Sequence, residues 1–294
     1  MARLPHPGSI VVGVDGSRSS QCALEWAAEE AQRLGTGLHL VHASDIEWLV
    51  AATLLVAADD DAVTDELLDL AVRDLRTRFP DLAVTAQVTT GAPAHDLIVA
   101  SEHARVVVVG AHGQTRARMP LGSVAHAVAM HAHSPVVVVR EHADPQAASG
   151  PVVVGVDGSS CSLAAVAFAM EQAVRRHTPL VAVHAWWLDF VDGVVVTTPG
   201  SPQWQRAAEA MRHTVTQSLA GACARYPDVE TTTRLVQARP AHALVEASRE
   251  ASLVVVGARG RGGFAGLLLG SVSREVLMHA HGPVAVARTP RHTW

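Results

Sequence analysis

The feature that most constrains the fold is an internal repeat. Val11–Ser17 returns as Val153–Ser159, and Val107–Gly113 returns, with His112 replaced by Arg259, as Val254–Gly260. Shorter matches follow in the same order, among them Leu40–Ala43 with Ala182–Ala185, Leu121–Val124 with Leu269–Val272, and Ser134–Val136 with Gly282–Val284. A period of roughly 145 residues is far longer than the roughly 20–50 residues of solenoid units, so the repeat predicts a duplicated domain.

The predicted organisation is therefore two domains in tandem. A chain of 294 residues is long enough for two domains that each bury their own core. We place the first at residues 1–140 and the second at 151–294. The polar run with Pro, Ala, Ser and Gly at 141–150 is the predicted linker.

Within each copy, short β-branched runs alternate with helical patterns. Four consecutive valines at Val106–Val109 and again at Val136–Val139 are typical of strands buried on both faces of a parallel sheet. Apolar residues at helical spacing run from Leu24 to Leu34 and from Leu163 to Val174. The predicted strands of copy one are Ile10–Val14, Leu38–Ala43, Leu82–Val88, Arg105–Gly110 and Val136–Arg140. The alternation predicts an α/β fold: two doubly wound, parallel, five-stranded sheets. The segments 44–61 and 186–203 fit neither pattern, and we expect the second to be a long loop.

Composition argues against several classes of function. The net charge of −5, with only 23 Lys plus Arg, gives no basis for a nucleic-acid partner. No apolar stretch approaches the roughly 20 residues of a membrane-spanning helix, and the N-terminus lacks the apolar core of a signal peptide. Three widely separated cysteines imply neither a disulfide framework nor a zinc knuckle. We therefore expect a cytoplasmic protein that binds neither nucleic acid nor membrane.

The first candidate site residue in each copy is the acid after strand one, Asp15 or Asp157, followed by Gly and Ser. Ligands of open α/β sheets bind beyond the carboxyl ends of the strands. A carboxylate there can hold a ribose hydroxyl, or a magnesium ion that rides on phosphates. The alternative is a strand-to-helix turn in which Asp and Ser only cap the next helix.

The second candidate is a glycine-rich loop after the fourth strand. In copy two it begins at Gly257, Arg259 and Gly260, and it ends at Gly270-Ser271-Val272-Ser273. Glycines let the backbone approach a phosphate closely, and a helix beginning at Ser271 would present free N–H groups and a favourable dipole. The hydroxyls of Ser271 and Ser273 can add hydrogen bonds, and Arg259 and Arg261 supply charge. The alternative is a surface loop followed by an ordinary helix.

A third candidate lies at the end of strand two. Backbone groups near Val41-His42 and Val183-His184 could hydrogen-bond an adenine edge. Only their position supports this interpretation. For the two histidine rings taken singly, a structural role is the stronger interpretation.

At the glycine loop the chain resembles the ATP-binding universal stress proteins. Their loop carries Gly, two residues, Gly, nine residues, then Gly and Ser or Thr, which Gly257, Gly260, Gly270 and Ser271 match in full. Copy one has Gly110, Gly113, Gly122, Ser123 and Val124, with eight residues between the second and third glycines. The resemblance covers nearly the whole chain and implies a fold like that of the adenine-nucleotide alpha hydrolases.

This resemblance implies ATP as the ligand, with Asp15 and Asp157 near the ribose or a magnesium ion and the glycines and serines at the phosphates. It also implies that the last strands, Val136–Arg140 and Val284–Arg288, pair so that the two halves form a pseudo-dimer; two chains could further form a homodimer. The shortened loop of copy one predicts two unequal sites, although Arg116 and Arg118 could compensate by charge.

Competing functions remain open at this stage. The P-loop pattern is absent because Gly270-Ser271 lacks a lysine, and the 17 histidines form no convincing metal set. His131/His133 and His279/His281 stand two residues apart, so neither pair shares one helix face. No nucleophile–base pair is readable. The hypotheses are a regulatory, stress-response protein controlled by ATP occupancy, which we favour; a slow Mg-dependent ATPase; and a scaffold that binds no nucleotide.

Overall fold

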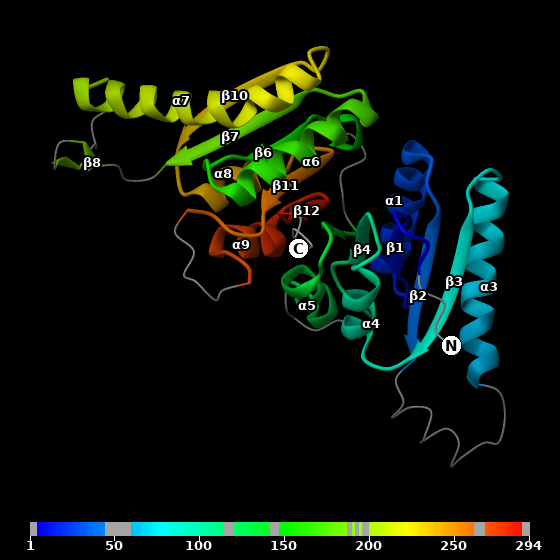
Figure 1. Ribbon diagram of the computed structural model, residues 1–294. Coiled ribbons are helices and arrows are strands. Elements are labelled where there is room, and N and C mark those ends of the chain that lie inside the picture. Colours follow the sequence, from blue (N-terminus) through cyan, green and yellow to red (C-terminus); the bar gives the residue numbers. More distant parts are fainter. Residues whose placement is uncertain are drawn as a thin grey trace, which may run out of the picture. The chain divides into compact units, whose positions relative to one another are not determined.

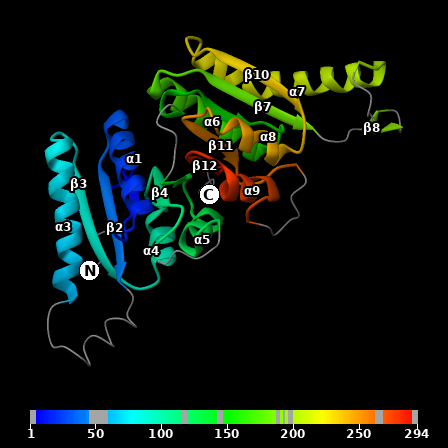
Figure 2. The ribbon, with the colours of Figure 1, turned by 180° about the vertical axis from the view of Figure 1, so that it is seen from behind.

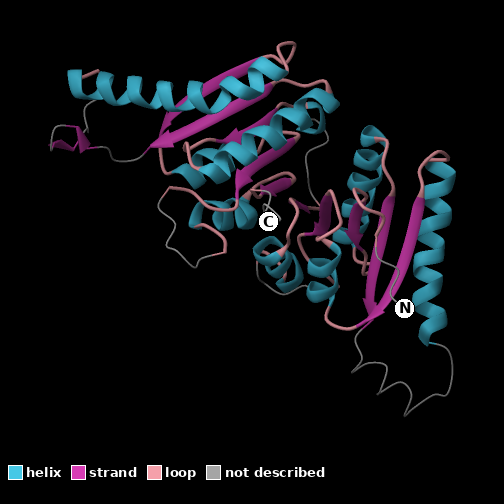
Figure 3. Cartoon of the chain, in the orientation of Figure 1, coloured by secondary structure: helices cyan, strands magenta, loops and turns pink. Residues whose placement is uncertain are grey.

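The computed structural model describes residues 5–44, 60–114, 120–141, 147–186, 190–191, 194–195, 200–261 and 268–289. The chain divides into two compact units, one ending at Glu141 and the other extending to Thr289. Figure 1 shows both units with their elements labelled, and Figure 3 shows that strands alternate with helices in each. Each unit is described by itself below.

Unit 1 contains a parallel sheet in the order β5-β4-β1-β2-β3. Its strands are β1 (Ile10–Gly13), β2 (Leu38–Ser44), β3 (Val84–Thr90), β4 (Val106–Gly110) and β5 (Val136–Val139). Its helices are α1 (Arg18–Leu34), α3 (Asp60–Arg78), α4 (Pro93–Ala100) and α5 (Ser123–His131). The strand order reverses direction after β1, which is the topology of a doubly wound sheet.

Unit 2 repeats this arrangement, with the sheet order β12-β11-β6-β7-β10. The strands are β6 (Val152–Gly155), β7 (Leu180–Trp186), β10 (Thr231–Gln237), β11 (Leu253–Gly257) and β12 (Val284–Ala287). The helices are α6 (Ser160–Arg176), α7 (Pro202–Arg225), α8 (Pro240–Ala247) and α9 (Ser271–His279), with a short 3₁₀ turn at Ala147–Ser149 before them. Figure 2 shows α6, α8 and α9 around this sheet from behind.

The predicted α/β class and parallel sheets are confirmed, and the reason is burial. All four valines of β4 that precede Gly110 are buried, as are all four residues of β5. Helices must therefore cover both faces of the sheet. In unit 1, α1 packs on β1 and β4, whereas α4 packs on β1 and β2 and touches α5.

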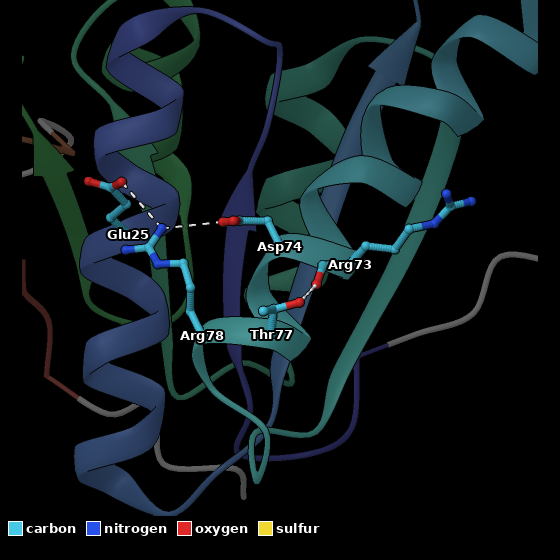
Figure 4. Close-up of polar contacts among 5 residues, drawn as sticks. All are labelled: Glu25, Arg73, Asp74, Thr77 and Arg78. Carbon is cyan, nitrogen blue, oxygen red and sulfur yellow. Dashed lines mark hydrogen bonds and ion pairs between the residues drawn. The ribbon is translucent and has the colours of Figure 1, made fainter.

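An arginine at the C-terminal end of α3 contacts α1. Arg78 extends to Glu25 of α1, with 3.4 Å between Nη1 and Oε1, and to Asp74 of its own helix at 3.3 Å. Figure 4 shows this pair of contacts and shows the Arg73 side chain extending away from them. These groups are exposed, so each ion pair contributes little to stability.

The segment 186–203 differs from the expected long loop. Trp186 is the last residue of β7, and Phe190–Val191 (β8) pairs antiparallel with Val194–Val195 (β9). The β-branched valines favour this small ladder over irregular chain. Most of the segment 44–61 lies outside the described residues.

None of the helices in the described part of the chain is long and apolar enough to cross a bilayer.

The last residue of β4 and of β11 packs directly against a helix backbone, which yields a stability prediction. A Cβ on Gly110 would lie 2.7 Å from the carbonyl carbon of Ser19, and one on Gly257 would lie 2.7 Å from that of Cys161. We expect Gly110→Ala and Gly257→Ala each to lower the free energy of unfolding by about 1–3 kcal/mol, measured by urea denaturation.

Gly221 is the matched control for both variants. It lies within α7, and a Cβ there would meet nothing within 4 Å. Gly221→Ala should raise stability by up to about 1 kcal/mol, because alanine is the better helix former. Equal effects at all three glycines would contradict the packing account.

Candidate functional site

The candidate site of each unit lies at the carboxyl ends of its first and fourth strands. In unit 2 the chain leaves β6 through Val156 and turns at Asp157-Gly158 into α6. Gly158 has a φ of +78°, a conformation that favours glycine, and Gly16 has the same φ in unit 1. The turn thus places one half-buried carboxylate beside the loop that follows β11.

Both oxygens of the Asp157 carboxylate accept backbone hydrogen bonds. Oδ1 accepts from the N–H of Ser159, and Oδ2 accepts from the N–H of Arg261, each at 2.9 Å. Burial alone would raise the pKa of Asp157, but hydrogen bonds from Ser159, Arg261 and Ser162 outweigh burial, so the pKa lies below its usual value. The carboxylate is therefore charged at neutral pH and fixed in orientation.

Asp15 occupies the same position in unit 1 with a different neighbour. Its Oδ1 accepts from the N–H of Ser17 at 2.9 Å, as in unit 2. The residue after the second glycine is Gln114 here, and its side-chain amide donates to the backbone carbonyl of Asp15. In both units that residue folds back onto the Asp turn.

The second glycine of each loop lies against the carboxylate. A Cβ built on Gly113 would stand 2.8 Å from Oδ2 of Asp15, and one on Gly260 would stand 2.5 Å from Oδ2 of Asp157. The loop and the acid predicted from sequence are thus brought together in both units.

The third glycine closes each loop. The N–H of Gly122 donates to the carbonyl of Ala111, and the N–H of Gly270 donates to that of Ala258, each at 2.8 Å. The closing bond is the same although the loop of unit 1 is one residue shorter. The shorter loop therefore begins its helix in the same way as the longer one.

The helices that follow these loops begin without a side-chain cap. Neither Gly122 before α5 nor Gly270 before α9 supplies a capping side chain. By contrast, Ser17 caps α1 and Ser159 caps α6 through their hydroxyls. Uncapped first-turn N–H groups are what an oxyanion binds at a helix N-terminus, and here they belong to Ser123 and Val124 in unit 1 and to Ser271 and Val272 in unit 2.

The histidines near the end of the second strand of each unit, His42 in β2 and His184 in β7, have a structural contact. Nδ1 of His42 lies 2.6 Å from the carbonyl of Val14, and Nδ1 of His184 lies 2.6 Å from that of Val156. Because a carbonyl only accepts, each Nδ1 carries the proton, and each ring supports the strand that leads to the Asp turn. Val41 and Val183 are buried, so their side chains belong to the core and only their backbone faces the predicted adenine side.

Two other predicted residues differ in their placement. Arg259 is exposed in the loop. The hydroxyl of Ser273 is instead buried and donates to the carbonyl of Gly257 at 2.6 Å, so it braces the loop from within. The predicted contributors Arg116 and Arg118 lie outside the described residues.

The sequence interpretation missed the serines that shape the turn. The hydroxyl of Ser20 accepts from the N–H of Asp15 at 3.3 Å, and that of Ser162 accepts from the N–H of Gly158 at 3.1 Å. The signal was present, because both copies carry a serine five residues after the acid. Its role required knowing that the turn and the helix share one hydrogen-bond network.

The histidine-rich ends of α5 and α9 show no metal set. No group of three or more His, Cys, Asp or Glu able to hold a metal ion exists among the residues that the structure describes. His133 lies 3.6 Å from Glu102, from Nε2 to Oε1.

Comparison with known proteins gives a consistent result across the chain. The model of the universal stress protein family matches residues 8–140 and 149–288. A universal stress protein of Mycolicibacterium smegmatis is 39% identical over 290 residues, covering 95% of this chain and 96% of that protein. One from Mycobacterium tuberculosis is 39% identical over 292 residues, with the same shares covered.

Solved structures resemble the chain in fold. The crystal structure of a universal stress protein from Archaeoglobus fulgidus has a TM-score of 0.64 at 19% identity and covers 95% of this chain and 98% of its own. A functionally unknown protein from Pseudomonas aeruginosa has a TM-score of 0.67 at 16% identity and covers 97% and 93%.

The lowered pKa of Asp157 predicts how stability depends on pH. Because this pKa is lower in the folded chain than in the unfolded chain, the unfolded state binds more protons below about pH 4. The contribution of Asp157 is thus fully present above about pH 4 and is lost as the pH falls through the folded-state pKa. We expect the free energy of unfolding, measured in urea at pH 7 and pH 3, to fall less in Asp157→Asn than in the parent chain. An identical fall in both proteins would contradict the charged state assigned to Asp157.

Proposed function

Because the chain belongs to the universal stress protein family, we propose that each unit binds an adenine nucleotide, ATP in particular, at the carboxyl edge of its sheet. One observation carries the proposal: α5 and α9 begin uncapped directly behind a closed glycine loop, while α1 and α6 in the same units are capped. Free N–H groups with a favourable dipole suit the phosphates.

The remaining parts of the nucleotide fit the surroundings. The Asp15 and Asp157 carboxylates, next to the second glycines, would accept from ribose hydroxyls. The backbone after Val41 and Val183 would meet the adenine. Exposed Arg259, together with Arg261, would add charge at the phosphates of unit 2.

A magnesium ion would be compatible with this arrangement. Each unit offers one carboxylate beside the loop, and Mg²⁺ commonly takes one or two carboxylates plus phosphate oxygens and water. Asp15 or Asp157 would hold it, and it would neutralise phosphate charge.

The biological role we propose is regulatory, in a stress response, with nucleotide occupancy setting the state of the loops and with the two units paired as a pseudo-dimer. A cytoplasmic location accords with Cys22, Cys161 and Cys223, which form no disulfide. The alternative of a slow ATPase keeps the same site and adds turnover.

The first test is to denature freshly purified protein and assay the supernatant for nucleotide by chromatography. We expect ATP at up to two per chain, and no decline of the ATP-to-ADP ratio on incubation. A declining ratio would favour the ATPase. If no nucleotide is recovered and millimolar Mg-ATP causes no thermal shift, the non-binding scaffold is the correct function.

The second test separates the two sites. In Gly270→Ala/Ser271→Ala a Cβ on Gly270 would meet nothing closer than 3.4 Å, so the chain should fold. We expect calorimetry to show that the affinity of one site falls by about tenfold or more, because the new methyl group hinders the phosphates from approaching the backbone. Gly122→Ala/Ser123→Ala is the matched variant of unit 1, and its site should differ in affinity from that of unit 2. Unchanged affinity and stoichiometry in both variants would refute the phosphate-loop assignment.

A further inference from the structure

Unit 1 contains a cavity at the edge of the sheet opposite the candidate nucleotide site. Its volume is about 420 Å³, and it lies at the amino ends of β1, β2 and β3, beside the last turn of α3. Figure 1 shows that α3 ends where β3 begins. The lining that matters here is His6, Ser9, Leu38, Arg76, Leu82 and Thr85.

One wall of this amino-edge cavity is a buried hydroxyl. Ser9 is only 3% exposed, and its Oγ has no hydrogen-bond partner among the described residues. A buried hydroxyl without a partner is destabilising, because it has lost its hydrogen bonds to water. A ligand atom that accepts its proton would remove this cost.

The charge of the cavity comes from Arg76. Its neighbour Arg78 is engaged by Glu25 and Asp74, whereas Arg76 makes no ion pair with any residue that the structure describes. The lining residues include no Asp or Glu. A guanidinium presents paired donors whose geometry matches a carboxylate or phosphate.

Behind the lining, His39 is buried and its Nδ1 lies 2.8 Å from Oγ1 of Thr85. Burial lowers the pKa of His39, the side chain of Gln87 raises it, and nearby His6 lowers it, with burial the largest effect. The ring is therefore neutral at pH 7, and it touches a residue of the cavity wall.

Unit 2 lacks these polar groups at the matching positions. When the two copies are aligned on their strands, Ser9 corresponds to Pro151, His39 to Val181 and Arg76 to Cys223. The core residue Leu38 corresponds to Leu180 and is kept. The polar cavity is thus a property of unit 1 rather than of the repeated fold.

We propose that the amino-edge cavity binds a small organic anion. Its oxyanion head lies between Arg76 and the hydroxyl of Ser9, and its apolar body rests on Leu38 and Leu82. The volume accommodates a single-ring acid. The site is independent of the proposed nucleotide site and does not rest on it.

The experiment follows histidine resonances by NMR in the full chain as benzoate, phenyl phosphate or neutral benzyl alcohol is added. His39 reports on the amino-edge cavity through Thr85, while His42 and His184 report on the opposite edge. We expect His39 to shift saturably with benzoate, phenyl phosphate or both, and not with benzyl alcohol. A response to only one anion identifies the head group as carboxylate or phosphate, and a response to both shows that the site accepts either.

Two arginine variants of α3 provide the matched comparison. Arg76→Gln should weaken the binding seen at His39 by about tenfold or more, because a charge-assisted contact is lost. Arg73→Gln removes the same charge from an exposed position outside the cavity lining and should leave binding unchanged. Ser9→Ala, which deletes the hydroxyl and adds no atom to the buried site, should weaken binding severalfold.

Three results would overturn the proposal. These are no saturable shift of His39 with either anion, an equal shift with benzyl alcohol, or a shift that Arg76→Gln leaves intact. Shifts confined to His42 and His184 would place the anions at the nucleotide edge and would equally reject it.

Discussion

The burial of valine strands on both faces is the constraint on which the rest of the structure depends. Val106–Val109 and Val136–Val139 are buried, so helices cover both faces of the sheet there. Ligands of such a sheet are expected beyond the ends of its strands. The candidate sites described above lie at strand ends.

At the carboxyl edge of each sheet, one helix has a side-chain cap at its N-terminus and another does not. Ser17 and Ser159 use their hydroxyls to satisfy the start of α1 and α6, so these helices serve the turn that holds the acid. The glycines before α5 and α9 leave their first turn open. In each unit, a first-turn N–H group of one helix is therefore capped by a serine hydroxyl. The first-turn N–H groups of the other helix are available to an anion.

Much of this was predictable from the sequence, since the repeat and the strand pattern depend on local composition and spacing. The acid, the glycines and the helix starts at Ser123 and Ser271 follow from the same patterns. What could not be predicted was which polar atoms are already used. The sequence predicts that the hydroxyl of Ser273 contacts phosphate, yet this hydroxyl donates to the carbonyl of Gly257. Ser162 looks in the sequence like an ordinary helix residue, yet its hydroxyl accepts a hydrogen bond from the turn at Gly158. The small β8–β9 ladder was missed because two-residue strands carry almost no periodic signal.

The bond that closes each glycine loop has a consequence for how such proteins diversify. Gly122 and Gly270 each make the same hydrogen bond, to the residue after the first glycine of their loop. A change in loop length is therefore confined to the residues between the two ends of this hydrogen bond. The start of the helix and the sheet behind it can stay the same when residues are inserted into or deleted from the loop. The loop can thus vary in length and sequence while the rest of the domain is unchanged. Because the chain carries two copies, the loop of one copy can change while the loop of the other is kept.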